Sequence, residues 1–232
     1  MDGFLLIDKP AGMTSHDVVD RVRRLTGIRQ IGHAGTLDPI ATGLLILGIG
    51  KATKAINALV GLDKTYEATL ILGATTETFD REGMVVVGTD RKPIPTIDTI
   101  NRALDKFRGG YDQRAPLFSA KKLHGKKLYE LARAGTATEE MRPVKHVTIS
   151  KLETGEYEWP KLRLVIDCSS GTYIRSLADD IGRELDVGAY MDELRRTRIG
   201  PYLVENAATL PNLDLKVIHN RLLPLATATE RP

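Results

Sequence analysis

The sequence predicts an α+β protein with a largely antiparallel sheet. Segments in which apolar and polar residues alternate, as in strands, are mixed with amphipathic segments of helical period. The two kinds do not alternate regularly, as they would in a protein built from repeated β-α-β units. With 232 residues, 42% of them hydrophobic and 27% charged, the chain is long enough for one large domain or one domain with a small addition.

The N-terminal segment predicts a strand, a turn and a helix. Residues 4–7 are apolar, and the strand ends before the turn that contains Lys9 and Pro10. Thr14 or Ser15 then provides an N-cap for a helix whose apolar stripe consists of Val18, Val19, Val22 and Leu25. A lysine in a turn of this kind, such as Lys9, ordinarily faces solvent.

The segment 31–48 is the most unusual part of the sequence. It holds a single carboxylate, Asp38, in a turn with Gly35 and Pro39, and it runs into the apolar stretch 44–49. Glycine permits unusual backbone angles, and proline keeps the residue before it out of the helical region. The carboxylate is therefore expected at the edge of a rigid loop. There it can act as a nucleophile or a base, or it can only cap a turn.

The middle of the chain predicts a pair of strands and a second helix. Residues 65–73 alternate, with Tyr66 on the buried face, where its ring lies in the core or in the wall of a pocket. A turn at 80–83 leads to a second strand at 84–87, giving a hairpin-like pair. Thr96 then caps a helix whose apolar face consists of Ile97, Ile100, Leu104 and Phe107.

The most basic stretch of the chain is 113–127. Phe118 and Tyr129 lie close to five basic residues, Lys121, Lys122, His124, Lys126 and Lys127. Basic residues beside aromatic ones suit a phosphate backbone with unstacked bases, and a solvated charged hairpin is the alternative. Ser119 and Lys122 also match the S-x-x-K signature of penicillin-binding enzymes. Because neither S-D-N nor K-T-G follows, a Ser–Lys hydrolase is a weak alternative.

The C-terminal half predicts a short helix at 128–134, strands at 147–152 and 162–168, and an amphipathic helix after Thr172. Arg175 falls in the first turn of that last helix. A cation at this position opposes the helix dipole, so the arginine is expected to have a carboxylate nearby.

Composition and spacing exclude several other kinds of site. The single cysteine, Cys168, excludes an internal disulfide, fits a reducing cytoplasm and is expected in the core. The five histidines lack metal-ligand spacing, so no metal is expected. The segment 48–53, GIGKAT, does not form a Walker phosphate loop. That pattern would need a glycine where this chain has Leu45, and Ser or Thr where it has Ala52. No apolar run reaches about 18 residues and no signal peptide is evident, so a soluble cytoplasmic protein is expected.

Six blocks of the sequence resemble, in order, the motifs of the TruB family of tRNA pseudouridine synthases. They are LLIDKPAGMTSHDVV, GHAGTLDPIATGLL, KTYEATLILGATTETFD, LFSAKKLHGKKLYELARAG, GTYIRSLADDIG and LRRT. The resemblance covers roughly residues 3 to 200 and is closer to the bacterial enzymes than to the guide-RNA synthases of archaea and eukaryotes. It implies the pseudouridine synthase fold, with a central, mostly antiparallel mixed sheet flanked by helices and loops, and a catalytic domain at 1–210.

The resemblance also implies roles for individual residues. Asp38 matches the catalytic nucleophile, and Arg175 matches the arginine that forms an ion pair with it, which keeps a carboxylate ionised. Tyr66 matches the tyrosine that stacks on the target base and handles a proton. Tyr173 and Leu194 match residues that line the uracil pocket. The reaction involves no redox change and no activated water, so neither a cofactor nor a metal is expected.

The remaining implied contacts involve RNA. His33 matches the histidine that enters the T-loop where the flipped base had been, since chemistry on a stacked base requires extrusion. Lys9 matches a residue that braces the active-site loop or contacts the RNA backbone. Further candidates for backbone contacts are Lys121, Lys122, Lys126 and Lys127.

The sequence departs from the family pattern in two places. Ala115 and Lys121 stand where the family usually has a proline and an apolar residue, within the basic insertion at about 113–146 that is expected to hold the T-arm. Residues 211–232 are expected to form only a short tail, because segments below about 40 residues seldom fold alone. An additional C-terminal RNA-binding domain is therefore expected to be absent or vestigial.

The leading hypothesis is an enzyme that isomerises uridine 55 in the T-loop of tRNA to pseudouridine, acting as a monomer without an obligatory protein partner. The alternatives are a non-catalytic tRNA-binding or folding module on the same scaffold, and a guide-RNA-dependent pseudouridine synthase. Asp38, Tyr66 and Arg175 favour the enzyme, because a binding module has no need of a paired acid beside an aromatic ring.

Overall fold

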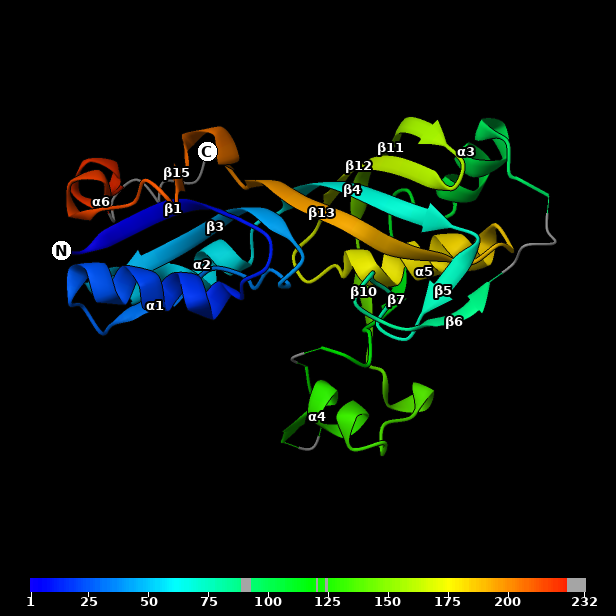
Figure 1. Ribbon diagram of the computed structural model, residues 1–232, viewed down its shortest axis with the longest axis horizontal. Helices are drawn as coiled ribbons and strands as arrows, with labels where there is room; N and C mark the ends of the chain where they lie inside the picture. Colours follow the sequence, from blue (N-terminus) through cyan, green and yellow to red (C-terminus); the bar gives the residue numbers. More distant parts are fainter. Residues whose placement is uncertain (89–92, 120, 124, 225–232) are drawn as a thin grey trace. The chain divides into compact units, whose positions relative to one another are not determined.

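The computed structural model describes residues 1–88, 93–119, 121–123 and 125–224 (Figure 1). The chain divides into two compact units: Met1–Glu67 with the chain from Leu194 onward, and Ala68–Glu193. Strands β4 (Lys64–Leu72) and β13 (Ala189–Ile199) each contribute residues to both units.

The sheet of the first unit is built around β3 (Thr42–Ile49). All seven residues of β1 (Gly3–Lys9) pair with β3 antiparallel, and the end of β13 pairs with β3 in parallel. β15 (Ala208–Thr209) pairs with β1 in parallel. β2 (Ile31–His33) pairs antiparallel with β3, and β14 (Tyr202–Leu203) pairs antiparallel with β13. The sheet is therefore mixed and mostly antiparallel, as the sequence predicts.

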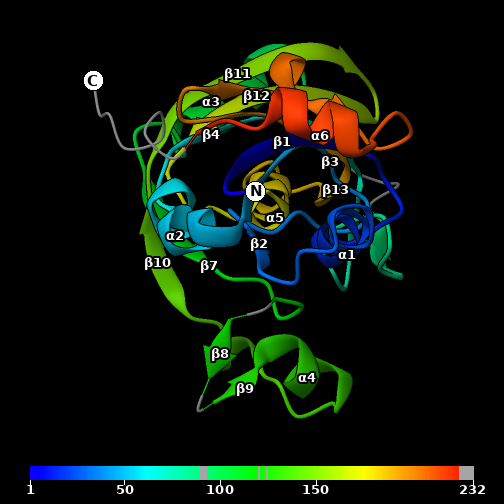
Figure 2. The ribbon, with the colours of Figure 1, turned by 90° about the vertical axis from the view of Figure 1, so that its left-hand side faces the viewer.

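Both faces of β1 and β3 are covered, which explains why 44–49 is continuously apolar. On one face, α1 (Ser15–Thr26) and α6 (Leu215–Arg221) pack against β1 and β3. On the other face lie η1 (Gly50–Ala55), α2 (Ile56–Val60) and η3 (Val204–Asn206) (Figure 2). Leu213 and Ile218, from the expected C-terminal tail, are buried in the first of these clusters. The described part of that segment, 211–224, thus packs onto the first unit.

Helix α1 begins at one of the two N-cap residues that its sequence predicts. The Thr14 side chain accepts a hydrogen bond from Asp17 N, and the Asp17 carboxylate accepts one from Thr14 N, which forms a capping box. Gly27, with a φ of 70°, ends the helix in the left-handed conformation. The capping box fixes where α1 starts, and the residues just before and at that start contact the Asp38 loop.

The second unit contains the strand order β11 (Ile149–Glu158), β12 (Lys161–Cys168), β4 and β13, with α5 (Ile174–Glu184) and α3 (Ile97–Asp105). Cys168 is buried, as expected. The predicted hairpin between 65–73 and 84–87 is wrong in its pairing. β6 (Val85–Gly88) pairs instead with β5 (Ala74–Thr76), because Gly73, with a φ of 94°, ends β4 and redirects the chain.

The basic segment lies within a long connection between two paired strands. β7 (Tyr111–Arg114) pairs antiparallel with β10 (Val144–Val147), and the chain between them forms this connection (Figure 2). It contains the ladder of β8 (Lys122–Leu123) and β9 (Lys126–Lys127), the helix α4 (Leu128–Arg133) and the turn η2 (Glu139–Met141). We call residues 115–143 the insertion, and β7 with β10 its stem.

Candidate active site

Asp38 lies in the loop between β2 and β3, and its side chain is half-buried. The amide of Ala41 donates a hydrogen bond to the carbonyl oxygen of Asp38 at 3.0 Å, which closes the turn predicted around Pro39. The loop connects two strands of one sheet, so both of its ends are fixed. The side chains that hold the residues between those ends come from β1, α1 and β13.

Lys9 supports this loop from β1. Its side chain is fully buried, and Nζ donates to the carbonyl oxygens of Met13 at 2.8 Å, Pro10 at 2.9 Å and Pro39 at 3.3 Å. Burial lowers the pKa of Lys9 to about 8, although the nearby Asp38 carboxylate acts in the opposite direction. The expected contact of Lys9 with an RNA backbone does not fit this placement, because a phosphate cannot reach a buried ammonium. The expected bracing of the loop does fit it.

Ser15 holds the residue before Asp38. Its Oγ accepts a hydrogen bond from Leu37 N at 2.9 Å and donates one to Leu37 O at 3.2 Å. The amide of Gly12 donates to Pro39 O at 2.9 Å on the other side of Asp38. Both neighbours of the carboxylate residue are therefore fixed by the segment that leads into α1.

Arg196 holds the loop from β13. This arginine is 1% exposed, and its guanidinium donates from Nε to Leu44 O at 2.8 Å and from Nη2 to Gly35 O at 3.0 Å. Sequence reasoning missed this role, because Arg196 entered it only as part of the resembling block LRRT. The neighbouring Arg195 forms a two-pronged ion pair with Asp8, at 2.8 and 3.0 Å.

His33 ends β2, close to the loop, and is half-buried. Burial, and then the charge of Arg196, lower the pKa of His33 below its ordinary value, which favours the neutral imidazole. Its Nδ1 is buried without a hydrogen-bond partner among the described residues. Tyr66 and Leu194 also belong to the first unit, and each is 8% exposed. The burial of Tyr66 agrees with the strand pattern, and the functional roles of all three residues stay predictions.

Arg175 lies in the second unit, at the start of α5, and has the nearby carboxylate that its helix position requires. Its Nη1 is 3.5 Å from Oδ2 of Asp80, and the two side chains are 7% and 6% exposed. Nη1 also donates to Thr78 O at 3.1 Å, and Nη2 donates to Phe118 O at 3.0 Å. Asp38 and Arg175 belong to different units, and the ion pair between them stays a prediction.

Asp80 is a functional candidate that sequence reasoning missed. Its Oδ1 accepts hydrogen bonds from Thr78 Oγ1 at 2.6 Å and from Glu82 N at 3.0 Å. The only signal in the sequence was its position in the resembling block KTYEATLILGATTETFD, where the residues that follow indicated an ordinary turn. The structure shows that this turn is built around a buried carboxylate.

Tyr173 directly precedes α5, and its backbone is fixed by Gln113 from the stem. The Gln113 side chain is 2% exposed, accepts from Tyr173 N at 2.8 Å and donates to Tyr173 O at 3.0 Å. The same amide donates to the Tyr111 hydroxyl at 2.6 Å. The stem of the insertion therefore sets the position of a residue predicted to line the uracil pocket.

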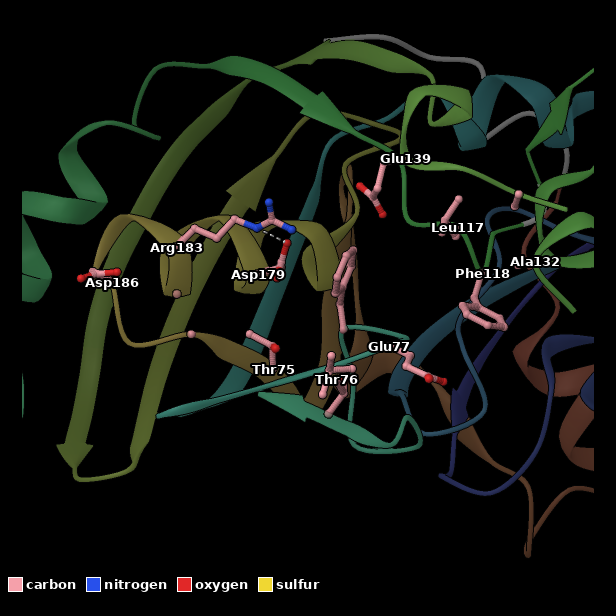
Figure 3. Close-up of a pocket in the computed structure, with 15 residues that line it drawn as sticks. Thr75, Thr76, Glu77, Leu117, Phe118, Ala132, Glu139, Asp179, Arg183 and Asp186 are labelled. Atoms are coloured by element: carbon pink, nitrogen blue, oxygen red, sulfur yellow. Dashed lines mark hydrogen bonds and ion pairs between the residues drawn. The ribbon is translucent and has the colours of Figure 1, made fainter. Parts of the chain in front are cut away.

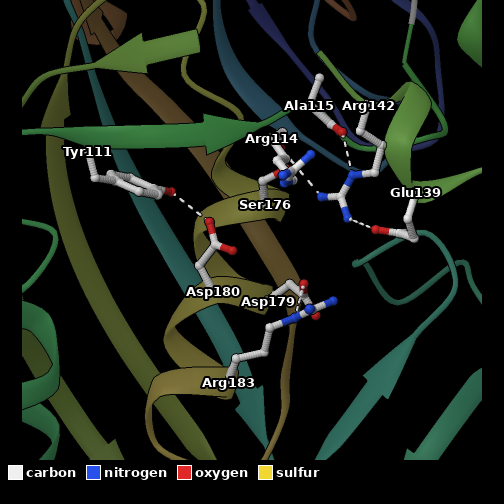
Figure 4. A network of polar contacts seen from close by, with 9 residues as sticks. All are labelled: Tyr111, Arg114, Ala115, Glu139, Arg142, Ser176, Asp179, Asp180 and Arg183. Atoms are coloured by element: carbon white, nitrogen blue, oxygen red, sulfur yellow. Dashed lines mark hydrogen bonds and ion pairs between the residues drawn. The ribbon is translucent and has the colours of Figure 1, made fainter. Parts of the chain in front are cut away.

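Further polar contacts join α5 to the stem and the insertion (Figure 4). The Tyr111 hydroxyl donates to Asp180 at 3.0 Å, and the Ser176 hydroxyl donates to Arg114 O at 2.8 Å. Desolvation by burial raises the pKa of Asp180 above its ordinary value. Arg142, which is 4% exposed, donates to Ala115 O at 2.8 Å and forms an ion pair with Glu139.

A pocket of about 780 Å³ lies in the second unit (Figure 3). Its lining comes from β5, β6 and the turn between them, the insertion, α5 and the turn after α5, and includes Phe79, Leu117, Phe118, Glu139, Asp179 and Arg183. The Arg142 guanidinium lies 5.1 Å from the centroid of the Phe79 ring. The pocket combines two aromatic rings with charges of both signs, and none of the sequence-predicted catalytic residues lines it.

The insertion presents some of the predicted RNA-backbone candidates. Lys121 and Lys126 are exposed, and Lys122 pairs with Lys127 in the β8–β9 ladder. His124 lies outside the described residues. The exposed lysines are available to phosphates, and their contacts with RNA stay predictions.

The described residues contain neither a metal-binding cluster nor a helix that could span a membrane. Residues 1–88, 93–119, 121–123 and 125–224 hold no group of three or more His, Cys, Asp or Glu side chains that could bind a metal ion. No helix in this part of the chain is long and apolar enough to cross a membrane.

Two family models match the chain. Residues 23–174 match the N-terminal domain of TruB family pseudouridylate synthases, and 175–225 match the C-terminal domain of tRNA pseudouridylate synthase B. Among similar proteins, tRNA pseudouridine synthase B of Syntrophotalea carbinolica is 43% identical over 98% of this chain and 74% of its own length. The tRNA pseudouridine synthase B of Aromatoleum aromaticum is 47% identical over 97% of this chain and 72% of its own length.

Solved structures also resemble the chain. A Cbf5–Nop10–Gar1 complex contains a chain that is 33% identical, with a TM-score of 0.71 over 91% of this chain. An H/ACA ribonucleoprotein bound to a substrate RNA with 2′-deoxyuridine contains one that is 30% identical, with a TM-score of 0.67. This chain spans about half the length of those two chains, at 53% and 52%.

Proposed function

Because this chain belongs to the TruB family of pseudouridylate synthases, we propose that it isomerises uridine 55 in the T-loop of tRNA to pseudouridine. The family membership makes it an isomerase that acts on tRNA. The position of the target base, the roles of the site residues and the following details are our proposal. The enzyme works in the cytoplasm as a monomer, binds the T-arm and needs neither a protein partner nor a cofactor.

In the proposed reaction the base leaves and rejoins the same ribose. Asp38 attacks the ribose or the uracil ring, and the bond between N1 and C1′ breaks. The base turns, a bond forms between C5 and C1′, and the bond between Asp38 and the substrate breaks, which frees the carboxylate. C5 loses its proton and N1 gains one. Arg175 keeps the acid ionised, and Tyr66 stacks on the base and handles the C5 proton.

The observation that carries the proposal is the support of the Asp38 loop. Lys9, Ser15 and Arg196, all at least 98% buried, hold backbone atoms of Leu37, Pro39 and the loop ends. An acid that only tied down a turn would not need three buried polar side chains from three elements. A nucleophile does need such support, because it must be held in its reactive geometry before the substrate arrives.

The proposal is tested by tritium release from an unmodified tRNA transcript labelled at C5 of uridine. The native protein alone should release tritium, and Asp38→Asn, at equal RNA binding, should release none. Binding without release by the native protein would favour the non-catalytic module. Release only after addition of a guide RNA and partner proteins would favour the guide-dependent alternative.

A further inference from the structure

We propose that Arg196 is a positioning residue that sets the geometry of Asp38 by tying together the two ends of its loop. The inference rests on the proposed function for the role of Asp38. Arg196 itself touches no reacting atom in this account. It acts through the backbone of the loop.

The first observation is the burial of an arginine that lacks an acidic partner. By volume, Arg196 is the largest side chain among those less than 2% exposed in the described part of the chain. In that same part of the chain, no carboxylate forms an ion pair with it. Its charge also contributes to the lowered pKa values of Lys9 and His33, two basic groups that lie near it. A buried, unpaired charge costs stability, so packing alone does not account for this residue.

The second observation is where the guanidinium donates. Gly35 O lies three residues before Asp38 and Leu44 O lies six residues after it, and Arg196 donates to both, at 3.0 and 2.8 Å. The planar guanidinium presents its donors in a fixed fork, so the two carbonyls are held at a set separation. A lysine ammonium at the same place would have no such fork.

The third observation is the close backbone approach of β13 to the loop. Arg196 pairs with Gly43 in the parallel ladder between β13 and β3. Gly43 has a φ of 99°, and a Cβ there would overlap the carbonyl oxygen of Arg196. The strand is therefore fixed against the start of β3 at the residue whose side chain reaches across to Gly35. Backbone pairing and side-chain fork together define one rigid clamp.

The clamp predicts a loss in catalysis without an equal loss in RNA binding. Misplacement of a reacting group by about 1 Å costs roughly 100-fold in rate. Arg196→Lys, which keeps the charge, should therefore lower kcat about 100-fold and change the KM for tRNA less than about threefold. The matched control is Arg198→Lys on the same strand, whose guanidinium donates to Thr65 Oγ1 and Gly200 O, outside the loop. That control should keep kcat within about twofold.

Chemical rescue separates positioning from a general structural role. Arg196→Ala should regain activity in millimolar guanidinium chloride, because the small cation can occupy the vacated site and donate to both carbonyls. Ammonium chloride at the same concentration should not restore activity. A wild-type kcat for Arg196→Lys, or equal effects of guanidinium and ammonium, would overturn the proposal.

A measurement without activity keeps this inference separate from the proposed function. Native-state hydrogen exchange of the amides at 35–44 should be faster in Arg196→Lys than in Arg198→Lys, with global stability measured in parallel. If the native protein proved inactive, the proposed function would fail, yet faster exchange confined to this loop would still establish the clamp. Unchanged exchange at 35–44 would refute the clamp even in an active enzyme.

Discussion

The Arg175 guanidinium lies 3.5 Å from the Asp80 carboxylate, and both side chains are more than nine-tenths buried. Removal of one partner from a buried ion pair is strongly destabilising and typically costs about 3–5 kcal/mol. Asp80→Asn should therefore lower the free energy of unfolding by about 3 kcal/mol, measured by urea denaturation. Asp192→Asn, which removes a partly exposed carboxylate 3.9 Å from Arg81, should cost less than about 1 kcal/mol. Equal losses in the two variants would contradict the buried-pair account.

The lowered pKa of Lys9 predicts a pH-dependent stability. The group titrates at about 8 in the folded protein and at 10.5 in a model compound, so between these values the unfolded state binds more protons. Below pH 8 both states are charged and the full cost of burying the ammonium is present. That cost is relieved as pH rises, so native stability should increase relative to Lys9→Met by up to about 3 kcal/mol between pH 8 and 10.5. Urea unfolding of both proteins across this range checks the slope, and parallel curves would contradict it.

Gln113 should be needed for the position of Tyr173. Gln113→Leu removes the hydrogen bond that Tyr173 N donates to the side chain and one of the bonds that Tyr173 O accepts, which costs about 1–3 kcal/mol at this site. Because the Tyr173 ring is predicted to line the uracil pocket, kcat should also fall. Gln30→Leu removes an exposed hydrogen bond to Thr53 and should change stability by less than about 0.5 kcal/mol. Full activity of Gln113→Leu would show that the stem does not position Tyr173 for catalysis.

The insertion should contribute phosphate contacts. Lys121→Ala combined with Lys126→Ala removes two exposed cations and should reduce the slope of log K against log salt for tRNA binding by about one to two units. Lys161→Ala combined with Lys216→Ala serves as the charge-matched control, because both lysines are exposed and lie outside the insertion. This control should keep the native slope. If both double variants change the slope equally, the lysines of the insertion make no specific phosphate contacts and only face solvent.

Local pattern was sufficient for many elements of the fold. Alternation predicted the burial of Tyr66 and Cys168, and the capping residues predicted where α1 starts. The pairing of β6 was predicted wrongly, because Gly73 alone did not reveal that the chain changes sheets there. Strand pairing depends on the geometry of the turn as well as on the hydrophobic pattern.

The support of the site could not be predicted in the same way. Lys9, Arg196 and Asp80 are polar residues that periodicity places at the surface or in turns, yet all three are buried. Their burial is explained by partners that lie far away in the sequence. Lys9 contacts Pro39, and Asp80 contacts Arg175. Arg196 contacts Gly35 and Leu44. Resemblance to a family identified Asp38 and Arg175 and gave bracing of the loop as one role of Lys9, but it did not indicate Ser15, Arg196 or Asp80.

The most direct test of the central claim is to map the product in tRNA treated with the native protein and with Asp38→Asn. Carbodiimide labels pseudouridine and stops reverse transcription next to it, so the stop reports the position of the modified base. We expect a stop at uridine 55 after treatment with the native protein alone and none after Asp38→Asn, with equal tRNA binding by both. A stop at another position, or an equal stop with Asp38→Asn, would contradict this claim.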